Sequence, residues 1–374
     1  MKFVVFGLSI SSSWGNGHAT LLRGLFKALV ARGHRITFFE RDTPYYAPHR
    51  DLTEMAGVSL ELYSDWEAAW VRAHAELRDA DIGMVTSYCP DGVTASEAVF
   101  ESKARRVFYD LDTPVTLQRL RGGQTLPYIG PRGLSDFDLV LSYTGGAAID
   151  ELQFRLGARR AIPLYGSVDP QMHRPVEAAD TYRGDLSYFG TYSEDRQKAL
   201  EQFFIEPARK LPHRRFVIGG ALYPHAFPWT GNIYFVRHIP PHDHSTFYCS
   251  SKLTLNVTRG PMAEMGYCPS GRLFEAAACG APTLTDEWEG LEQFFEPGRE
   301  ILMARTTEDA MAAIELSSEE LHKISQAARA RVMEQHTAEH RAMELEVALE
   351  FTNRELQAGF PLRTEQAQDT QLGA

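Results

Sequence analysis

Residues 2–40 decide the fold class of this chain, and they read KFVVFGLSISSSWGNGHATLLRGLFKALVARGHRITFFE. The apolar run at 2–7 predicts a buried strand, and residues 35–40 predict a second one. Between them, leucines recur at helical spacing over 20–32, and Gly33 follows as a helix terminator. A strand, a helix and a strand in this order form a βαβ unit, which is the repeating element of a parallel sheet.

The same alternation continues along the whole chain. Further strands are predicted at 83–88, 106–110, 139–143 and 161–164, then at 185–190, 215–219, 233–236, 252–257 and 282–285. Residues 165–175, which read YGSVDPQMHRP, break both periodicities and predict an exposed connection between domains. The sequence therefore predicts an α/β protein with two Rossmann-like, doubly wound parallel-sheet domains.

These patterns set the expected domain boundaries. We predict a first domain over 1–168, a second over 169–336, a helix over 337–356 that packs back on the first domain, and a polar tail over 357–374. The packing face of that helix consists of Ala342, Leu345, Ala348 and Leu349. An upstream helix is expected to begin at the capping box of Ser317 and Glu320.

Composition excludes several classes of protein. The 374 residues are 44% hydrophobic, which suffices for two cores, and 38 Lys+Arg against 49 Asp+Glu give a formal net charge of -11. That charge repels a phosphate backbone, so nucleic acid is not expected as the primary partner. No apolar signal core or membrane-spanning run is present, and the four cysteines are too scattered for a disulfide framework. We expect a soluble cytoplasmic protein with reduced thiols.

The first candidate site is the loop 11–18, Ser-Ser-Ser-Trp-Gly-Asn-Gly-His, which leads into the first helix. Gly15, Asn16 and Gly17 allow backbone N–H groups to approach a ligand, and the helix N-terminus behind them favours an anion or a sugar oxygen. The alternative is a glycine turn that only joins strand to helix. His18 is either a functional imidazole or a residue that caps this turn.

The second candidate site lies in residues 268–300, which read CPSGRLFEAAACGAPTLTDEWEGLEQFFEPGRE. Ser270 and Gly271 open a short helix, so its free N–H groups point outward from the end of a strand. Arg272 adds a fixed cation, and the three residues together form a predicted diphosphate site. Glu275, one turn further, can accept hydrogen bonds from two ribose hydroxyls.

This second segment resembles the donor-binding motif of glycosyltransferases with the two-Rossmann-domain GT-B architecture, within the glycosyltransferase group 1 family. It is most similar to the CgeB (spore maturation protein) family. The resemblance extends to residues 188–196, 238–248 and 254–259, and in the first domain it is confined to the Gly15–His18 loop. It implies a nucleotide-sugar donor, linked to UDP, GDP or dTDP, held by the second domain, and an acceptor held mainly by the first.

The resemblance also implies residue roles. Arg196, Arg259 and Arg272 become candidates for the diphosphate, and Glu275 becomes the candidate for the ribose. Asp286 and Gly290 become candidates for the sugar, and Gly190 lies within the motif that carries the donor. The implied reaction is transfer of a sugar to a hydroxyl or similar nucleophile in the cleft between the domains, with no cofactor and no metal ion. A clamp of cations suits this reaction because negative charge develops on the leaving diphosphate.

The catalytic residues expected in the first domain are His18 and Asp112. His18 lies where inverting relatives place a catalytic histidine, and a neutral imidazole can remove a hydroxyl proton. Asp112 follows the predicted strand 106–110, whose carboxyl end should face the cleft. Retaining relatives carry a glutamate eight residues before Glu275, but Tyr267 stands there. Both stereochemical outcomes therefore remain open.

The sequence also contains a cluster of potential zinc ligands. A zinc site at His238, His242, His244 and Cys249 is disfavoured, because these residues lack the two spaced ligand pairs of a structural site.

Three other functions fit the same sequence patterns. A sugar-nucleotide epimerase or hydrolase shares the expected architecture. A nucleotide-sugar-binding protein without catalysis, or a doubly wound binding protein whose glycine turns are purely structural, fits the pattern as well.

Overall fold

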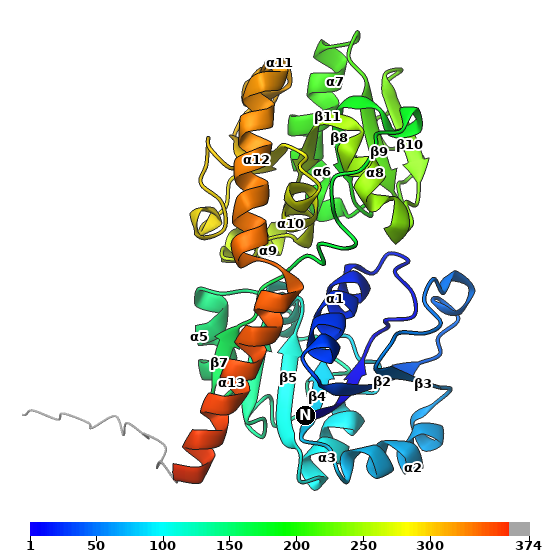
Figure 1. Cartoon of the computed structure of the whole chain (residues 1–374), viewed down its shortest axis with the longest axis vertical. Coiled ribbons are helices and arrows are strands. Elements are labelled where there is room, and N and C mark those ends of the chain that lie inside the picture. The colour runs from blue at the N-terminus through cyan, green and yellow to red at the C-terminus, as the bar shows by residue number, and fades with distance from the viewer. Residues whose placement is uncertain (359–374) are drawn as a thin grey trace, which may run out of the picture.

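The structure is a computed structural model that describes residues 1–358, with side chains of the last helix described as far as Thr352. Two α/β domains lie end to end, and the chain passes between them twice (Figure 1). The first crossing is the segment after β7 (Ala161–Pro163), and the second is the junction of α12 (Ser318–Gln335) with α13 (Ala338–Ala358).

The first domain is built on a seven-stranded parallel sheet in the order β3-β2-β1-β4-β5-β6-β7. Its other strands are β1 (Lys2–Gly7), β2 (Arg35–Arg41), β3 (Val58–Tyr63), β4 (Ile82–Thr86), β5 (Arg105–Asp110) and β6 (Leu139–Ser142). Its helices are α1 (Gly17–Ala31), α2 (Trp66–Leu77), α3 (Gly92–Glu101), α4 (Thr113–Arg121) and α5 (Ala147–Phe154). The direction of winding reverses between β1 and β4, which is where ligands bind in open α/β sheets.

The second domain repeats this plan with six parallel strands in the order β10-β9-β8-β11-β12-β13. The strands are β8 (Gly184–Phe189), β9 (Phe216–Gly220), β10 (Ile233–Arg237), β11 (Ser251–Asn256), β12 (Thr283–Asp286) and β13 (Leu302–Ala304). Its helices before α12 are α6 (Gln197–Leu200), α7 (Glu206–Lys210), α8 (His244–Cys249), α9 (Gly260–Met265), α10 (Gly271–Ala278) and α11 (Thr307–Glu315). Here the winding reverses between β8 and β11.

The two-domain parallel-sheet fold predicted from the sequence is confirmed. Strand β3 is missing from the prediction. Its sequence, VSLELY, alternates apolar and polar residues, but the strand lies at the sheet edge and only Tyr63 is buried. An edge strand lacks the continuous apolar run by which the central strands were found. The helical segment that follows β8 contains a π-helical turn, Glu201–Ile205, just before Pro207, which has no N–H to donate to a regular helix.

The connection between the domains agrees with the prediction only in part. We expected residues 165–175 to be exposed; Met172 and Arg174 are exposed, but Val168 and His173 are 2% and 1% exposed. Val168 pairs with Thr337 in an isolated bridge, so both crossings of the chain are held together. This pairing accounts for the burial of Val168, whereas Met172 of the same segment is 40% exposed.

Helix α13 packs back on the first domain. Ala342, Leu345 and Leu349 are fully buried in the same core as Leu25 and Leu29 of α1, which agrees with the predicted packing face. The capping box of Ser317 and Glu320 is present at α12. Helix α13 continues to Ala358, and residues 359–374 of the predicted polar tail lie outside the described part of the chain.

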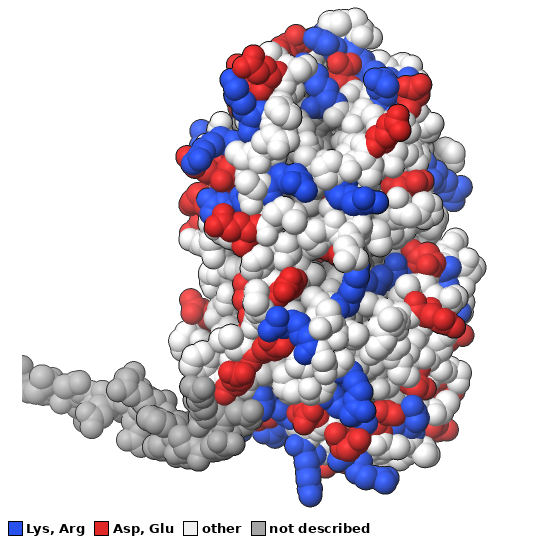
Figure 2. All heavy atoms as spheres, viewed as in Figure 1, with Lys and Arg blue, Asp and Glu red and all other residues white. Residues whose placement is uncertain are grey.

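The surface shows no segregation of charge on the face drawn in Figure 2, where basic and acidic side chains are interspersed over both domains. Among residues 1–358, no helix is both long enough and apolar enough to cross a bilayer.

Candidate functional site

The candidate site lies where the carboxyl ends of both sheets face each other. The loop after β6 meets the start of the 268–300 motif, because the Gly145 N–H donates to the Tyr267 carbonyl over 3.0 Å. Thr144 Oγ1 donates to Cys268 Sγ over 3.0 Å. Helix α4 of the first domain packs on α9 of the second. The sequence-predicted residues of both domains are therefore brought to one junction.

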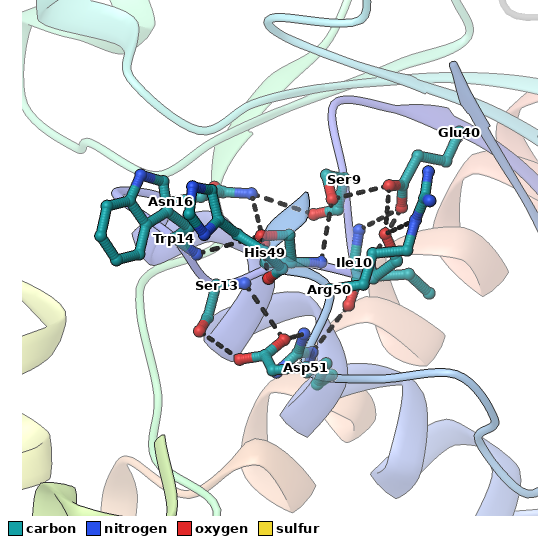
Figure 3. A network of polar contacts seen from close by, with 12 residues as sticks. Ser9, Ile10, Ser13, Trp14, Asn16, Glu40, His49, Arg50 and Asp51 are labelled. Atoms are coloured by element: carbon teal, nitrogen blue, oxygen red, sulfur yellow. Dashed lines mark hydrogen bonds and ion pairs between the residues drawn. The ribbon is translucent and has the colours of Figure 1, made fainter. Parts of the chain in front are cut away.

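The loop after β1 is shaped by a buried carboxylate at the end of the neighbouring strand (Figure 3). Glu40 is fully buried, and its Oε2 accepts from the N–H groups of Ile10 and Ser11 over 2.8 and 2.9 Å. Its Oε1 accepts from the hydroxyls of Ser9 and Ser11. Among the described residues no cation pairs with Glu40, so four loop donors alone stabilise its charge.

Asn16 is part of this loop architecture. Its side-chain amide donates to the carbonyls of Ser9 and Ser12, and its Oδ1 accepts from the His18 N–H at 3.1 Å, which caps α1. Gly15 has a positive φ of 60°, and an added Cβ at Gly17 would meet nothing within 4 Å. The structure thus engages the Asn16 side chain in fixing the turn, and it leaves the space beside Gly17 open.

His18 and Asp112 lie side by side. His18 Nε2 is 3.5 Å from Asp112 Oδ2, and their side chains are 19% and 14% exposed. His18 Nδ1 is buried without a partner. A carboxylate beside one ring nitrogen fixes the proton there and leaves a lone pair on the other. The pair therefore has the arrangement of a general base with its orienting acid.

The pKa of Asp112 reflects several opposing influences. Burial alone would raise the pKa of Asp112, but the hydrogen bond and charge of His18, the charge of Arg259 and the hydroxyl of Tyr88 together hold it below its usual value. Arg259 belongs to the second domain, so a cation of one domain stabilises a carboxylate of the other. Asp112 is consequently ionised over the neutral pH range.

Asp110 lies two residues before Asp112, and its pKa is shifted in the opposite direction. It is fully buried, and burial raises the pKa of Asp110 to about 6. Oδ1 accepts from the Asp112 N–H and from Thr116 Oγ1, both at 3.1 Å, whereas Oδ2 has no partner. The two carboxylates of the Asp-Leu-Asp segment therefore have different environments, and Asp110 shapes the turn on which Asp112 stands.

Two guanidinium groups without acidic partners lie at the carboxyl ends of the second sheet. Among the described residues neither Arg196 nor Arg272 forms an ion pair. Arg272 donates instead to the carbonyls of Phe189 and Val257, at 2.7 and 3.4 Å, and Arg196 donates to the carbonyl of Thr191. Burial lowers the pKa of Arg196, and the neighbouring charges of Arg272 and Arg259 lower it further. An anion is the ligand that would relieve this concentration of positive charge.

The residues around Arg272 fit this arrangement. An added Cβ at Gly190 would lie 2.5 Å from an Arg272 nitrogen, so only glycine allows the guanidinium to reach the end of β8. Ser270 Oγ accepts from Arg272 Nε at 3.1 Å, and Ser270 is the N-cap of α10. Gly271 begins that helix beside Tyr143 of the first domain. The free N–H groups of α10 and the guanidinium therefore face the same junction.

The remaining predicted donor residues have identified partners. Arg259 pairs with Asp195 at 3.1 Å, and Glu275 accepts from the Tyr248 hydroxyl at 3.1 Å. Asp286 Oδ1 accepts from both the N–H and the hydroxyl of Thr258, and burial raises the pKa of Asp286. These contacts orient the carboxylates, and Oδ2 of Asp286 has no hydrogen bond among the described residues.

Gly290 meets Tyr267 rather than open space. An added Cβ at Gly290, where φ is 86°, would lie 2.4 Å from the Tyr267 ring. One at Gly146 of the first domain would lie 2.5 Å from the same ring. Tyr267 itself has a positive φ of 47°, which is strained for a bulky residue. Its ring is therefore a wedge between the domains, and this is where the glutamate of retaining relatives would be expected.

The histidines of the disfavoured zinc set do not converge. The His238 ring lies 4.5 Å from the Trp14 ring across the domain junction, and Trp14 stacks on His49 at 4.1 Å. The side chain of His242 is 78% exposed. His244 is buried, and burial lowers its pKa to about 4.

Sequence reasoning missed Glu40, Tyr88 and the role of Tyr267. Glu40 lies at the end of the predicted second strand, and parallel neighbouring strands end at the same sheet edge. Its position could therefore have predicted a contact with the serine-rich loop after the first strand. Nothing in the local sequence indicates that Tyr267 separates the domains. A hollow of about 410 Å³ between Arg215 and Tyr234 lies at the opposite, amino ends of β9 and β10, away from this site.

Comparison with known proteins bears directly on this arrangement. Residues 196–347 match the family model described as "Glycosyl transferase-like", a segment that begins at Arg196 and includes the whole 268–300 motif. Most of the second domain is therefore similar to this family. The matched segment is shorter than half of the chain, and it ends within α13. No curated protein sequence matches the chain significantly.

Solved structures extend the likeness to both domains. Sucrose-phosphate synthase from Thermosynechococcus elongatus superposes with a TM-score of 0.69 at 14% identity, covering 96% of this chain and 100% of that one. HepE of Anabaena, in complex with UDP and glucose, superposes with a TM-score of 0.64 at 12% identity, covering 94% of this chain and 100% of that one. An alpha-glucosyltransferase in complex with UDP and DNA superposes with a TM-score of 0.69 at 10% identity, covering 94% of this chain and 99% of that one. The chain has the GT-B fold predicted from its sequence.

Proposed function

We propose that the protein is a glycosyltransferase that moves a sugar from a nucleoside diphosphate-sugar to an acceptor hydroxyl at the domain junction. The observation that carries the proposal is the pair of unpartnered guanidiniums, Arg196 and Arg272, beside the N-terminus of α10. Two partly buried positive charges and free N–H groups form a binding site for a diphosphate. The glycosyl transferase-like match over the same residues supports this assignment.

The proposed reaction needs a proton acceptor and a stabilised leaving group. The acceptor O–H gives its proton to the His18 imidazole, while Asp112 stabilises the resulting imidazolium. The acceptor oxygen bonds to the anomeric carbon, whose bond to the diphosphate breaks with its electron pair passing to the phosphate oxygen. Arg196, Arg272 and Arg259 stabilise that developing charge, so no metal ion is required at the diphosphate. Glu275 is assigned to the ribose, and Asp286 with Gly290 to the sugar.

UDP is the first nucleotide to test, because two of the similar structures contain it. The 188–196, 238–248 and 254–259 segments together with the 268–300 motif favour the CgeB-like group within the glycosyltransferases. The four cysteines are unbridged, which favours a cytoplasmic location.

Calorimetric titration with UDP, GDP and dTDP tests the donor site. Loss of one charge-assisted contact in Arg196→Ala should weaken the preferred nucleotide by about 10- to 100-fold. Arg299→Ala is the matched control, because Arg299 is exposed and, among the described residues, pairs only with Glu296. Equal affinity for the wild type, Arg196→Ala and Arg272→Ala would show that the proposed diphosphate site is wrong.

Turnover assays separate transfer from the other activities. Incubation with the bound nucleotide-sugar alone should release the sugar slowly, and an acceptor panel should accelerate release and yield a glycosylated product. Rapid conversion of the sugar without acceptor would instead indicate an epimerase or hydrolase. Tight binding with no conversion over the panel would indicate a non-catalytic binding protein.

A further inference from the structure

Three side chains from separate segments converge behind the donor motif. His173 lies in the interdomain connection, His244 begins α8 and Glu275 lies on α10. One potential ligand atom of each lies within 4.8 Å of the other two. His173 is 1% exposed and His244 is 7% exposed. The proposed transfer reaction uses neither histidine.

The two imidazoles have unused ring nitrogens. Neither Nδ1 nor Nε2 of His173 has a hydrogen-bond partner, and Nδ1 of His244 has none. Burial of a polar atom without a partner is unfavourable, so the unpartnered nitrogens of the two rings indicate that a ligand belongs between them. The centroids of the two histidine rings lie 5.7 Å apart.

The ring of His244 and the carboxylate of Glu275 are already oriented by other contacts. His244 Nε2 lies 3.2 Å from the Ile239 carbonyl. A carbonyl can only accept, so Nε2 carries the proton and Nδ1 presents a lone pair. The Tyr248 hydroxyl donates to Glu275 Oε2 and fixes that carboxylate. Metal-binding histidines and carboxylates usually have outer partners of this kind.

Glu275 also lacks a cationic partner. Within the described part of the chain no ion pair involves its carboxylate, although it is only partly exposed. Arg272, whose charge interacts with that of Glu275, donates to the Phe189 and Val257 carbonyls instead of to the carboxylate. The Glu275 carboxylate beside the unpartnered imidazole nitrogens therefore has no ion-pair partner among the described residues.

We propose that His173, His244 and Glu275 bind a divalent transition-metal ion of the zinc type. Imidazole nitrogen and carboxylate oxygen suit such an ion. Three atoms at most 4.8 Å apart can lie within about 2.8 Å of one centre, so shifts of under about 1 Å reach zinc bond lengths. The ion fastens the interdomain connection to α8 and α10, a structural role. This structural role is separate from the proposed function. The Glu275 oxygen that does not bind the ion retains a lone pair that can accept a hydrogen bond from a donor hydroxyl.

The test measures metal content rather than activity. The full chain, freed of any histidine tag, is incubated with Zn²⁺, passed over chelating resin and analysed by mass spectrometry of the metal. We expect about one zinc ion per chain, and X-ray absorption should show two imidazoles and bonds of about 2.0–2.1 Å. Excess Mg²⁺, which prefers oxygen ligands, should not displace it.

His173→Phe and His244→Phe preserve the ring volume and should each lower zinc affinity at least about tenfold. His242→Phe is the control, because it removes an exposed neighbouring histidine and should bind zinc as the wild type does. Circular dichroism of the metal-free proteins verifies that each variant is folded. A folded wild type that retains no zinc, or folded variants that retain it fully, would overturn the site whether or not sugar transfer is observed.

Discussion

His18 of the first helix and Asp112 of the β5–α4 turn meet at 3.5 Å, although 94 positions separate them in the chain (112 minus 18). The carboxylate faces one imidazole nitrogen, and the other nitrogen is left without a partner. The structure thus brings together two residues that the sequence analysis selected separately, and they form the acid–base pair of the proposed reaction.

Replacement of His18 should abolish most of the proposed transferase activity. In His18→Gln we expect kcat to fall by about 10²–10⁴, because general-base assistance is lost. Asp112→Asn should also lower kcat, whereas Asp112→Glu should partly restore it, since Asp112 acts through His18. Donor dissociation constants measured by calorimetry should remain unchanged in all three. His242→Gln is the control, and a weakened donor affinity without a change in kcat would contradict this assignment.

The buried carboxylate of Glu40 should be needed for both stability and activity. Glu40→Ala leaves the N–H groups of Ile10 and Ser11 without an acceptor, and we expect a loss of about 2–4 kcal/mol in the free energy of unfolding. The loop that positions His18 should shift as well, so activity should fall under conditions where the protein is still folded. Urea denaturation measures the first effect. Glu54→Ala, at an exposed site, should change neither quantity.

Asp110 should make the protein less stable as the pH rises. Its pKa is raised to about 6 by burial, so between about pH 4 and pH 6 the folded state binds more protons than the unfolded state. The free energy of unfolding therefore falls over this range, by about 2–3 kcal/mol from this residue. Asp110→Asn removes the effect. We expect urea denaturation to show that the free energy of unfolding of the variant, relative to that of the wild type, is higher at pH 7.5 than at pH 4.5. If the difference in free energy of unfolding between the two proteins is the same at both pH values, the assignment is refuted.

The Tyr267 wedge can be tested with two glycines of similar backbone conformation. Gly290 and Gly298 have φ of 86° and 80°, but only Gly290 faces a ring, at 2.4 Å from an added Cβ. Gly298→Ala should cost about 1 kcal/mol from strain, and Gly290→Ala should cost about 1–3 kcal/mol more from the clash. In a Tyr267→Ala background this excess should disappear. Equal losses for the two glycine variants would rule out a rigid wedge.

Much of the fold follows from local patterns. The βαβ unit of residues 2–40, the capping box at Ser317 and the apolar face of α13 each depend on interactions within a few turns. Periodicity and capping chemistry report such interactions directly. Strand β3 and the buried connection were not found in this way, because their structure depends on neighbours that are distant in the chain.

The sequence by itself determined the architecture and the set of candidate residues. Asp112 could be selected because it follows a strand whose carboxyl end should face the domain junction, and His18 because it ends the glycine-rich loop before the first helix. Arg272 lies at a helix start that predicts a diphosphate site, and Arg196 was implied by the resemblance to the donor-binding motif. Only the tertiary structure decided which of them meet. The His18–Asp112 contact, the unpaired state of Arg196, the Tyr267 wedge and the His173–His244–Glu275 cluster all join segments from different strands or domains. Distances of this kind are set by how two sheets pack together, and no local pattern in the chain records them.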